Sequence, residues 1–345
     1  MLPCEKNNTS FFEKLQNCEG LDLRDNRGKR HDLAIILLEV TWAILSNRDG
    51  KMSSIHRHLQ KHHNQLLEFL DLEPRRSVSR AHLPLILEKV SVAEFDGLIF
   101  ASYGLKLSAK QKKWFAIDGK ELRGSIEKGA KRGAVVVQAV AHETGATQSQ
   151  NYYHGRKESE VKTARNLLAE HDLWGQKISL DALHCKPKTL APIVTAKGIY
   201  LVGLKRKQKE LFHQMSATIT ELPVNYSFEK EEKGHGRITL RNYQVYDIQA
   251  VQKAERWTGS KIATIVKVKR KSVAMKTGKE SEETSYYLSN EKGKMNELCA
   301  AVRAHWQVEV NHHRRDVTFA EDRLRTKKSK SVKRWQKSEL WLRYC

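Results

Sequence analysis

Three acidic residues, Asp118, Asp181 and Glu309, are the side chains in this sequence best suited to carry chemistry. Asp118 and Asp181 each follow a short apolar run, and Glu309 belongs to a long run with helical periodicity. Three converging carboxylates repel one another and need cations, and Mg²⁺ favours oxygen ligands together with water and phosphate. Two such ions would activate an attacking oxygen and stabilise a leaving oxygen in phosphodiester displacement. The three residues are therefore predicted to bind Mg²⁺, for which Mn²⁺ could substitute.

Each acid also has a simpler interpretation. Asp118 is followed by glycine, and Asp–Gly pairs are common in turns. Asp181 could cap a following helix, and Glu309 could lie on a solvated helix face. Their joint position favours catalysis, because functional groups gather at the carboxyl ends of adjacent strands. Two spare acids could replace or support Glu309, namely Glu160 and Glu321.

The elements that would position these acids alternate between strands and helices from residue 113 onward. Strands are predicted at 114–117, 133–141, 146–153, 177–180 and 199–204. Helices are predicted at 157–171, 187–197, 208–219 and 294–311. Residues 222–290 are predicted to be a β-rich insertion, with strands at 238–246, 261–269 and 284–288. An α/β fold with a mixed sheet flanked by helices follows from this order.

The domain organisation follows from a change of pattern near residue 105. Residues 1–105 are predicted to form an all-helical domain, with helices at 31–45, 51–72, 79–90 and 92–103. Residues 106–330 are predicted to form the α/β domain that carries the three acids. The tail at 331–345 is basic and rich in tryptophan, which sets it apart from both.

The charge indicates an anionic partner. The 345 residues include 62 Lys and Arg against 40 Asp and Glu, which gives a net charge of +22. A field of this sign attracts polyanions, of which nucleic acid is the commonest. A basic protein without such a partner, or one drawn to anionic membranes, is the alternative. Nucleic acid is favoured because no basic amphipathic helix with a broad apolar face stands out.

Composition also narrows the compartment. The most apolar run, 33–45, is too short to cross a bilayer and contains Glu39. No secretory signal is recognisable at the N-terminus. The five cysteines are scattered, without zinc-binding spacing. A cytoplasmic protein without a membrane partner is expected.

Four segments of the sequence, residues 116–125, 180–185, 204–208 and 303–322, together resemble the motifs of one family, the DDE-type insertion-sequence transposases of the H-repeat-associated group. Residues 116–125 are similar to its first-aspartate motif and 180–185 to its second. The basic turn at 204–208 and the segment 303–322 resemble the motifs that follow. The resemblance runs in order from about residue 28 to 328.

The resemblance implies a ribonuclease H-like core in which Asp118, Asp181 and Glu309 are the catalytic, metal-binding triad. It implies metal-dependent cleavage of DNA at the ends of an insertion sequence, followed by strand transfer into target DNA. Double-stranded DNA would be the partner, bound by a homodimer associated with the nucleoid, and the N-terminal domain would bind the element's ends. Candidate DNA contacts are Lys120, Arg123, Lys205, Lys207 and His305.

Two departures from the family pattern leave alternatives open. Asp316 comes one position earlier than in the family, and 331–345 does not resemble the apolar helix found there, as in a frameshifted copy. The first alternative function is therefore a catalytically disabled, DNA-binding remnant of such a transposase. The second is a nuclease of the same fold that hydrolyses strands without joining them.

Overall fold

The computed structural model describes residues 10–47, 51–103, 107–108, 110–126, 129, 131–154 and 157–318. The predicted tail at 331–345 and the spare acid Glu321 lie outside these residues, as do 104–106 at the expected domain boundary.

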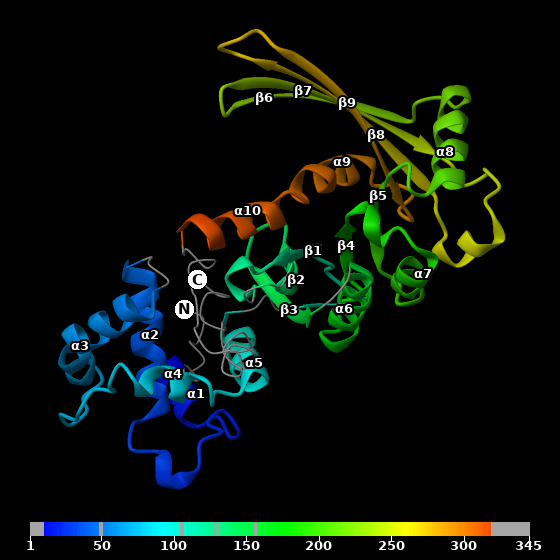
Figure 1. Ribbon diagram of the computed structural model, residues 1–345. Helices are drawn as coiled ribbons and strands as arrows, with labels where there is room; N and C mark the ends of the chain where they lie inside the picture. Colours follow the sequence, from blue (N-terminus) through cyan, green and yellow to red (C-terminus); the bar gives the residue numbers. More distant parts are fainter. Residues whose placement is uncertain are drawn as a thin grey trace, which may run out of the picture.

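The described strands form one nine-stranded sheet with the order β3-β2-β1-β4-β5-β9-β8-β7-β6 (Figure 1). Its first five strands are β1 Trp114–Glu121, β2 Ala134–Ala141, β3 Thr147–His154, β4 Lys177–Leu180 and β5 Ile199–Leu204. Strands β1, β2 and β3 pair antiparallel, whereas β1, β4 and β5 pair parallel. This is the ribonuclease H-like mixed sheet expected from the sequence, and the α/β prediction is confirmed.

Helices cover both faces of this sheet. On one face lie α6 Lys157–Glu170, α7 Pro187–Thr195 and α8 Lys209–Glu221, which share the largest apolar cluster with β1, β4 and β5. On the other lie α9 Met295–Ala304 and α10 Gln307–His313. Val308 of α10 packs on Ala116 of β1 and Val140 of β2, so the helix that carries Glu309 is fixed against the strand that carries Asp118.

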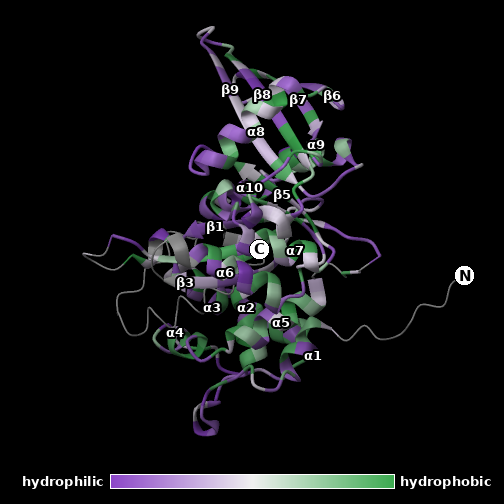
Figure 2. Cartoon of the chain, turned by 90° about the vertical axis from the view of Figure 1, so that its right-hand side faces the viewer, coloured by the Kyte–Doolittle hydropathy of each residue, from purple (hydrophilic) through white to green (hydrophobic). Residues whose placement is uncertain are grey.

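The predicted insertion extends the sheet. Its strands are β6 Tyr226–Gly234, β7 Arg237–Asp247, β8 Thr264–Ala274 and β9 Glu280–Ser289. Strand β9 pairs with β5, from Leu201 opposite Ser289 to Leu204 opposite Tyr286. Both views show the far ends of these strands projecting from the molecule (Figures 1 and 2).

The N-terminal region is helical, as predicted. Its helices are α1 Phe11–Gln16, α2 Leu33–Asn47, α3 Met52–Phe69, α4 His82–Leu87 and α5 Val92–Tyr103. They share an apolar cluster of their own and lie at the opposite end of the molecule from the insertion (Figures 1 and 2). Within the described ranges, no helix has both the length and the apolar character needed to cross a membrane.

The structure corrects the predicted elements at several points. Strand β1 does not end before Asp118 but continues to Glu121, because β2 pairs with it over that whole length. The helix predicted at 294–311 is interrupted at His305 and Trp306, which separate α9 from α10. Helix α4 is shorter than the 79–90 predicted. Helix α1, which begins with a capping box formed by Ser10 and Glu13, was not predicted.

Candidate active site

The pairing of β1 with β4 places the two aspartates side by side. Ile117 lies opposite Leu180 in this parallel pair, so Asp118 and Asp181 are the next residues on neighbouring strands. Strand β4 ends there, and the edge of β1 that faces β4 loses its strand partner from Asp118 onward. An opening therefore forms in the sheet beside both carboxylates.

The turn after Asp181 keeps this opening narrow. The carboxylate of Asp181 accepts a 2.8 Å hydrogen bond from the backbone N–H of Leu183 and caps the short 3₁₀ turn 182–184. That turn packs on β5 at Gly203, where a Cβ would lie only 3.1 Å from the backbone nitrogen of Ala182. A glycine at this position lets the turn lie directly against the strand.

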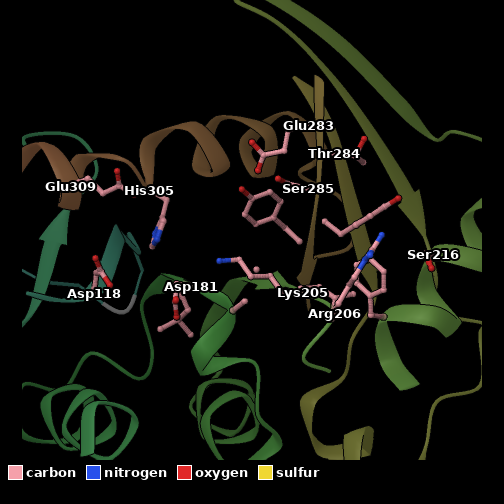
Figure 3. Close-up of a pocket in the computed structure, with 17 residues that line it drawn as sticks. Asp118, Asp181, Lys205, Arg206, Ser216, Glu283, Thr284, Ser285, His305 and Glu309 are labelled. Atoms are coloured by element: carbon pink, nitrogen blue, oxygen red, sulfur yellow. The ribbon is translucent and has the colours of Figure 1, made fainter. Parts of the chain in front are cut away.

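Glu309 joins the aspartates from the opposite face of the sheet. Asp118, Asp181, His305 and Glu309 line one cavity of about 740 Å³, which continues past Lys205 towards β9. In Figure 3 the side chains of His305 and Glu309 lie on the α9–α10 side, above the two aspartates. The structure thus places all three predicted catalytic residues around one cavity.

The surroundings of Asp118 and Asp181 disfavour a negative charge on both carboxyl groups at once. Burial raises the pKa of Asp118 to about 7, and the nearby carboxylates of Asp181 and Glu160 add to the effect. The backbone N–H of Gly119 and the imidazole of His184 act in the opposite direction. A carboxyl whose charge is this unfavourable is typical of a functional site, because a bound cation would relieve the repulsion.

His305 is held from behind by a buried hydrogen-bond chain. The hydroxyl oxygen of Ser179 lies 2.8 Å from Nδ1 of His305 and 2.8 Å from Nε2 of His142. Because a hydroxyl has one proton, it donates to one partner, an imidazole nitrogen or the carbonyl oxygen of Phe115 at 3.5 Å, and accepts from a ring N–H. Burial lowers the pKa of His305 to about 4 and that of His142 to about 3, so both rings are neutral at pH 7. His142 in turn stacks on Trp114, with ring centroids 5.6 Å apart.

Replacing Ser179 with Ala is expected to lower the free energy of unfolding by about 1–3 kcal/mol, because two buried imidazole nitrogens lose their partner. Denaturant unfolding followed by circular dichroism measures this change. The exposed serine of β9 provides the control, since Ser281→Ala should cost less than about 0.5 kcal/mol. Equal stability of the two variants would show that the hydrogen-bond chain through Ser179 does not hold His305 in place.

The comparisons with known proteins identify the family. The family model for the transposase DDE domain matches residues 109–336, well over half of the chain. The chain belongs to this transposase family.

Curated relatives of this DDE transposase extend the match to the N-terminal helices. "H repeat-associated putative transposase YhhI" of Escherichia coli (strain K12) is 28% identical over 309 residues, covering 87% of this chain and 81% of that protein. "Putative transposase YncI" of Escherichia coli O157:H7 is 30% identical over 231 residues, 63% of this chain and 57% of that protein. "Uncharacterized protein in dhlA 3'region" of Xanthobacter autotrophicus is 27% identical over 278 residues, 78% of this chain and 90% of that protein. The predicted resemblance to the H-repeat-associated group is confirmed.

The chemistry of this candidate site fits a hard divalent cation. Its donors are carboxylate oxygens, two of them on adjacent strands, and repulsion between those two is unrelieved. Within the described ranges, no three Asp, Glu, His or Cys side chains stand in a geometry that already holds a metal ion. Asp118, Asp181 and Glu309 would hold Mg²⁺ by closing around it.

The structure separates the predicted DNA contacts of the transposase into two kinds. Arg123, Lys205 and Lys207 are exposed, and Lys205 lines the cavity beside Asp181. Lys120 instead has a side chain only 7% exposed, and its Nζ lies 2.7 Å from the carboxylate of Asp316. The structure therefore gives Lys120 an internal partner where a phosphate contact was expected.

Three side chains at this candidate site were not singled out from the sequence. His142 and His184 follow strands and carry no local signal of their role. Ser179 had one available signal, since it is the lone small polar residue in the buried strand β4. A serine that is 1% exposed needs a hydrogen-bond partner, and here its hydroxyl lies within hydrogen-bond distance of two imidazoles and of the carbonyl oxygen of Phe115.

Proposed function

We propose that this chain catalyses the metal-dependent cleavage of DNA at the ends of an insertion sequence and the transfer of the cut strand into target DNA. The register of β1 and β4 carries the proposal, because it sets Asp118 beside Asp181 at an opening in the sheet. Glu309 lines the same cavity from α10. Membership of the DDE transposase family supports the same function.

The protein residues act by positioning and by charge. Asp118, Asp181 and Glu309 would bind Mg²⁺, with Mn²⁺ as a substitute, and so hold a phosphate of the DNA in the cavity. The cation supplies a lower pKa for the attacking water or hydroxyl and charge stabilisation for the leaving oxygen. Neutral His305, whose ring lies between the aspartates and Glu309 (Figure 3), is placed to hydrogen-bond a phosphate oxygen.

The DNA partner is supported by the charge of the molecule and by its distribution. The net charge is +22, and Lys205, Arg206 and Lys207 directly follow the end of β5 beside the aspartates. The exposed Lys205 and Lys207 would contact phosphates there, and Arg123 would do so beyond β1. The N-terminal helical domain would bind the element's ends. A homodimer follows from the need to process two ends, and the protein would act in the cytoplasm on nucleoid DNA.

The test is cleavage of DNA that carries the ends of the element encoding this chain. Full-length protein with Mg²⁺ is expected to nick each end and leave a 3′-hydroxyl, and Mn²⁺ should replace Mg²⁺. Pre-cut ends should be joined to a supercoiled target plasmid. EDTA and the Asp181→Asn variant are the controls, and neither should support cleavage although DNA binding persists.

Two other outcomes would reject this proposal in favour of a rival. Tight, salt-sensitive binding without cleavage by the wild-type protein would identify a catalytically disabled remnant. Cleavage without joining of pre-cut ends would identify a nuclease that only hydrolyses DNA.

A further inference from the structure

A fourth carboxylate, Glu160, lies against the aspartates from the α6 side. Its side chain is 12% exposed, and its Oε2 accepts a 3.2 Å hydrogen bond from the hydroxyl of Tyr153. The contact with β1 is so close that a Cβ on Gly119 would lie 2.8 Å from Cδ of Glu160. Glycine at residue 119 thus allows Glu160 to approach the strand that carries Asp118.

A buried histidine without a hydrogen-bond partner points into the same cluster. The side chain of His184 is 0% exposed, and neither of its ring nitrogens has a hydrogen-bond partner among the described residues. Its Nε2 lies 3.7 Å from Oε1 of Glu160 and 3.9 Å from Oδ1 of Asp181. Buried imidazole nitrogens normally have hydrogen-bond partners. This ring is therefore placed to donate a hydrogen bond to one of the carboxylates after a bound ligand has fixed the carboxylate's position.

The two glutamates lie on opposite sides of the two aspartates. Glu309 lines the cavity of about 740 Å³ on the α10 side. Glu160 lines a second cavity of about 980 Å³, together with the basic residues Lys131, Arg132, Lys186, Lys205 and Lys207. Asp118 and Asp181 line both cavities. Glu283 also lines the first cavity and Glu121 the second, but Glu283 pairs with Arg270 and Glu121 accepts a 3.1 Å hydrogen bond from the backbone N–H of Gly133. Glu309 and Glu160 are therefore the glutamates best placed to act with the aspartates, one on each side.

We propose that Glu160 is a metal ligand, so that the site takes two divalent cations with Asp118 and Asp181 between them. Glu309 would complete the cation site in one cavity and Glu160 the cation site in the other. His184 would be a positioning residue, which donates a hydrogen bond to Glu160 or Asp181 once a cation draws the carboxylates together. This inference rests on the proposed function and adds a fourth acid to it.

The competing explanation is that Glu160 only anchors α6 through Tyr153. An anchoring residue would affect stability without affecting the number of bound cations. Counting cations directly, in the absence of DNA and of any cleavage, therefore separates the two roles.

The experiment is a titration of the full-length protein with Mn²⁺, in which electron paramagnetic resonance measures the free ion. The wild-type protein is expected to bind two Mn²⁺ ions, whereas Glu160→Gln and Glu309→Gln should each bind one. The matched control is Glu170→Gln, which changes a glutamate on the same helix that also accepts a side-chain hydrogen bond, from Asn151 at 2.8 Å. It should bind two.

A second variant leaves every carboxylate in place. Gly119→Ala adds a methyl group where Glu160 now lies, so it should displace Glu160 and weaken one Mn²⁺ site at least tenfold. Circular dichroism and thermal unfolding confirm that each variant is folded before it is titrated.

The outcomes distinguish this inference from the proposed function. Two ions bound by folded Glu160→Gln, with affinities unchanged, would overturn the role of Glu160 and leave the triad intact. A wild-type protein that binds one ion, lost only on replacing Asp118, Asp181 or Glu309, would do the same. A wild-type protein that binds no Mn²⁺ would overturn both proposals.

Discussion

Asp118→Asn is expected to reduce Mg²⁺-dependent cleavage by about 10³-fold or more and, in the absence of divalent metal, to make the protein more stable. The loss follows because an amide is a poor substitute for a carboxylate that two cation sites would share. The gain follows because the folded protein holds Asp118 in a buried position beside Asp181 and Glu160, where its charge is unfavourable. Function and stability therefore oppose each other at this residue.

The pH dependence of the gain has a definite sign. Folding raises the pKa of this carboxyl from 3.8 to about 7, so ionisation above pH 3.8 favours the unfolded chain. The wild-type protein loses stability from this group as pH rises from 4 to 7, and the loss is complete above the folded-state pKa. A shift of this size corresponds to about 4 kcal/mol. The variant should gain about 2 kcal/mol, because the buried amide also loses hydration.

Thermal unfolding in EDTA at several pH values measures this difference. Asp118→Asn should be about 2 kcal/mol less stable than the wild type near pH 4, where only the cost of burying the amide remains, and about 2 kcal/mol more stable above pH 7. Asp247→Asn, at the half-buried C-terminal end of β7, is the control and should show no such trend. A variant less stable than the wild type at pH 7.5 would contradict the electrostatic account of the site.

Local sequence pattern predicted the core elements well where burial alone determines them. Strands β4 and β5 have the predicted bounds, because β5 is a continuous apolar run and β4 a short buried segment, each between turn residues. Strand β1 was predicted too short, since its second half is polar. Those residues remain in the strand because β2 supplies their backbone partners, and pairing between distant segments leaves no local trace.

The site was predicted only in part for the same reason. Asp118 and Asp181 could be found because each follows an apolar strand, and the parallel order of the sheet makes neighbours of such positions. The approach of Glu160 could not, because it depends on how α6 packs over Gly119. Nor could the chain from His142 through Ser179 to His305, which joins three separate elements.

The predicted DNA contacts give a second prediction with a large effect, in which exposed and buried lysines behave differently. Replacing Lys205 and Lys207 together with Ala is expected to weaken DNA binding by about 10–100-fold, because each exposed ammonium would neutralise a phosphate beside the aspartates. The slope of log K against log salt concentration should become shallower by about 1.8, the contribution of two phosphate contacts. Fluorescence anisotropy with labelled duplex DNA over a range of salt concentrations measures both quantities.

Lys120→Ala is the matched control, since it removes the same charge from a residue that the sequence also marked as a DNA contact. Its ammonium is buried against Asp316, so its loss should leave the salt slope unchanged and lower the stability of the protein instead. If Lys120→Ala flattened the slope as much as one of the exposed lysines, the ion pair with Asp316 would have to open on binding DNA. Loss of affinity by the double variant without a change in slope would mean that Lys205 and Lys207 do not contact phosphates.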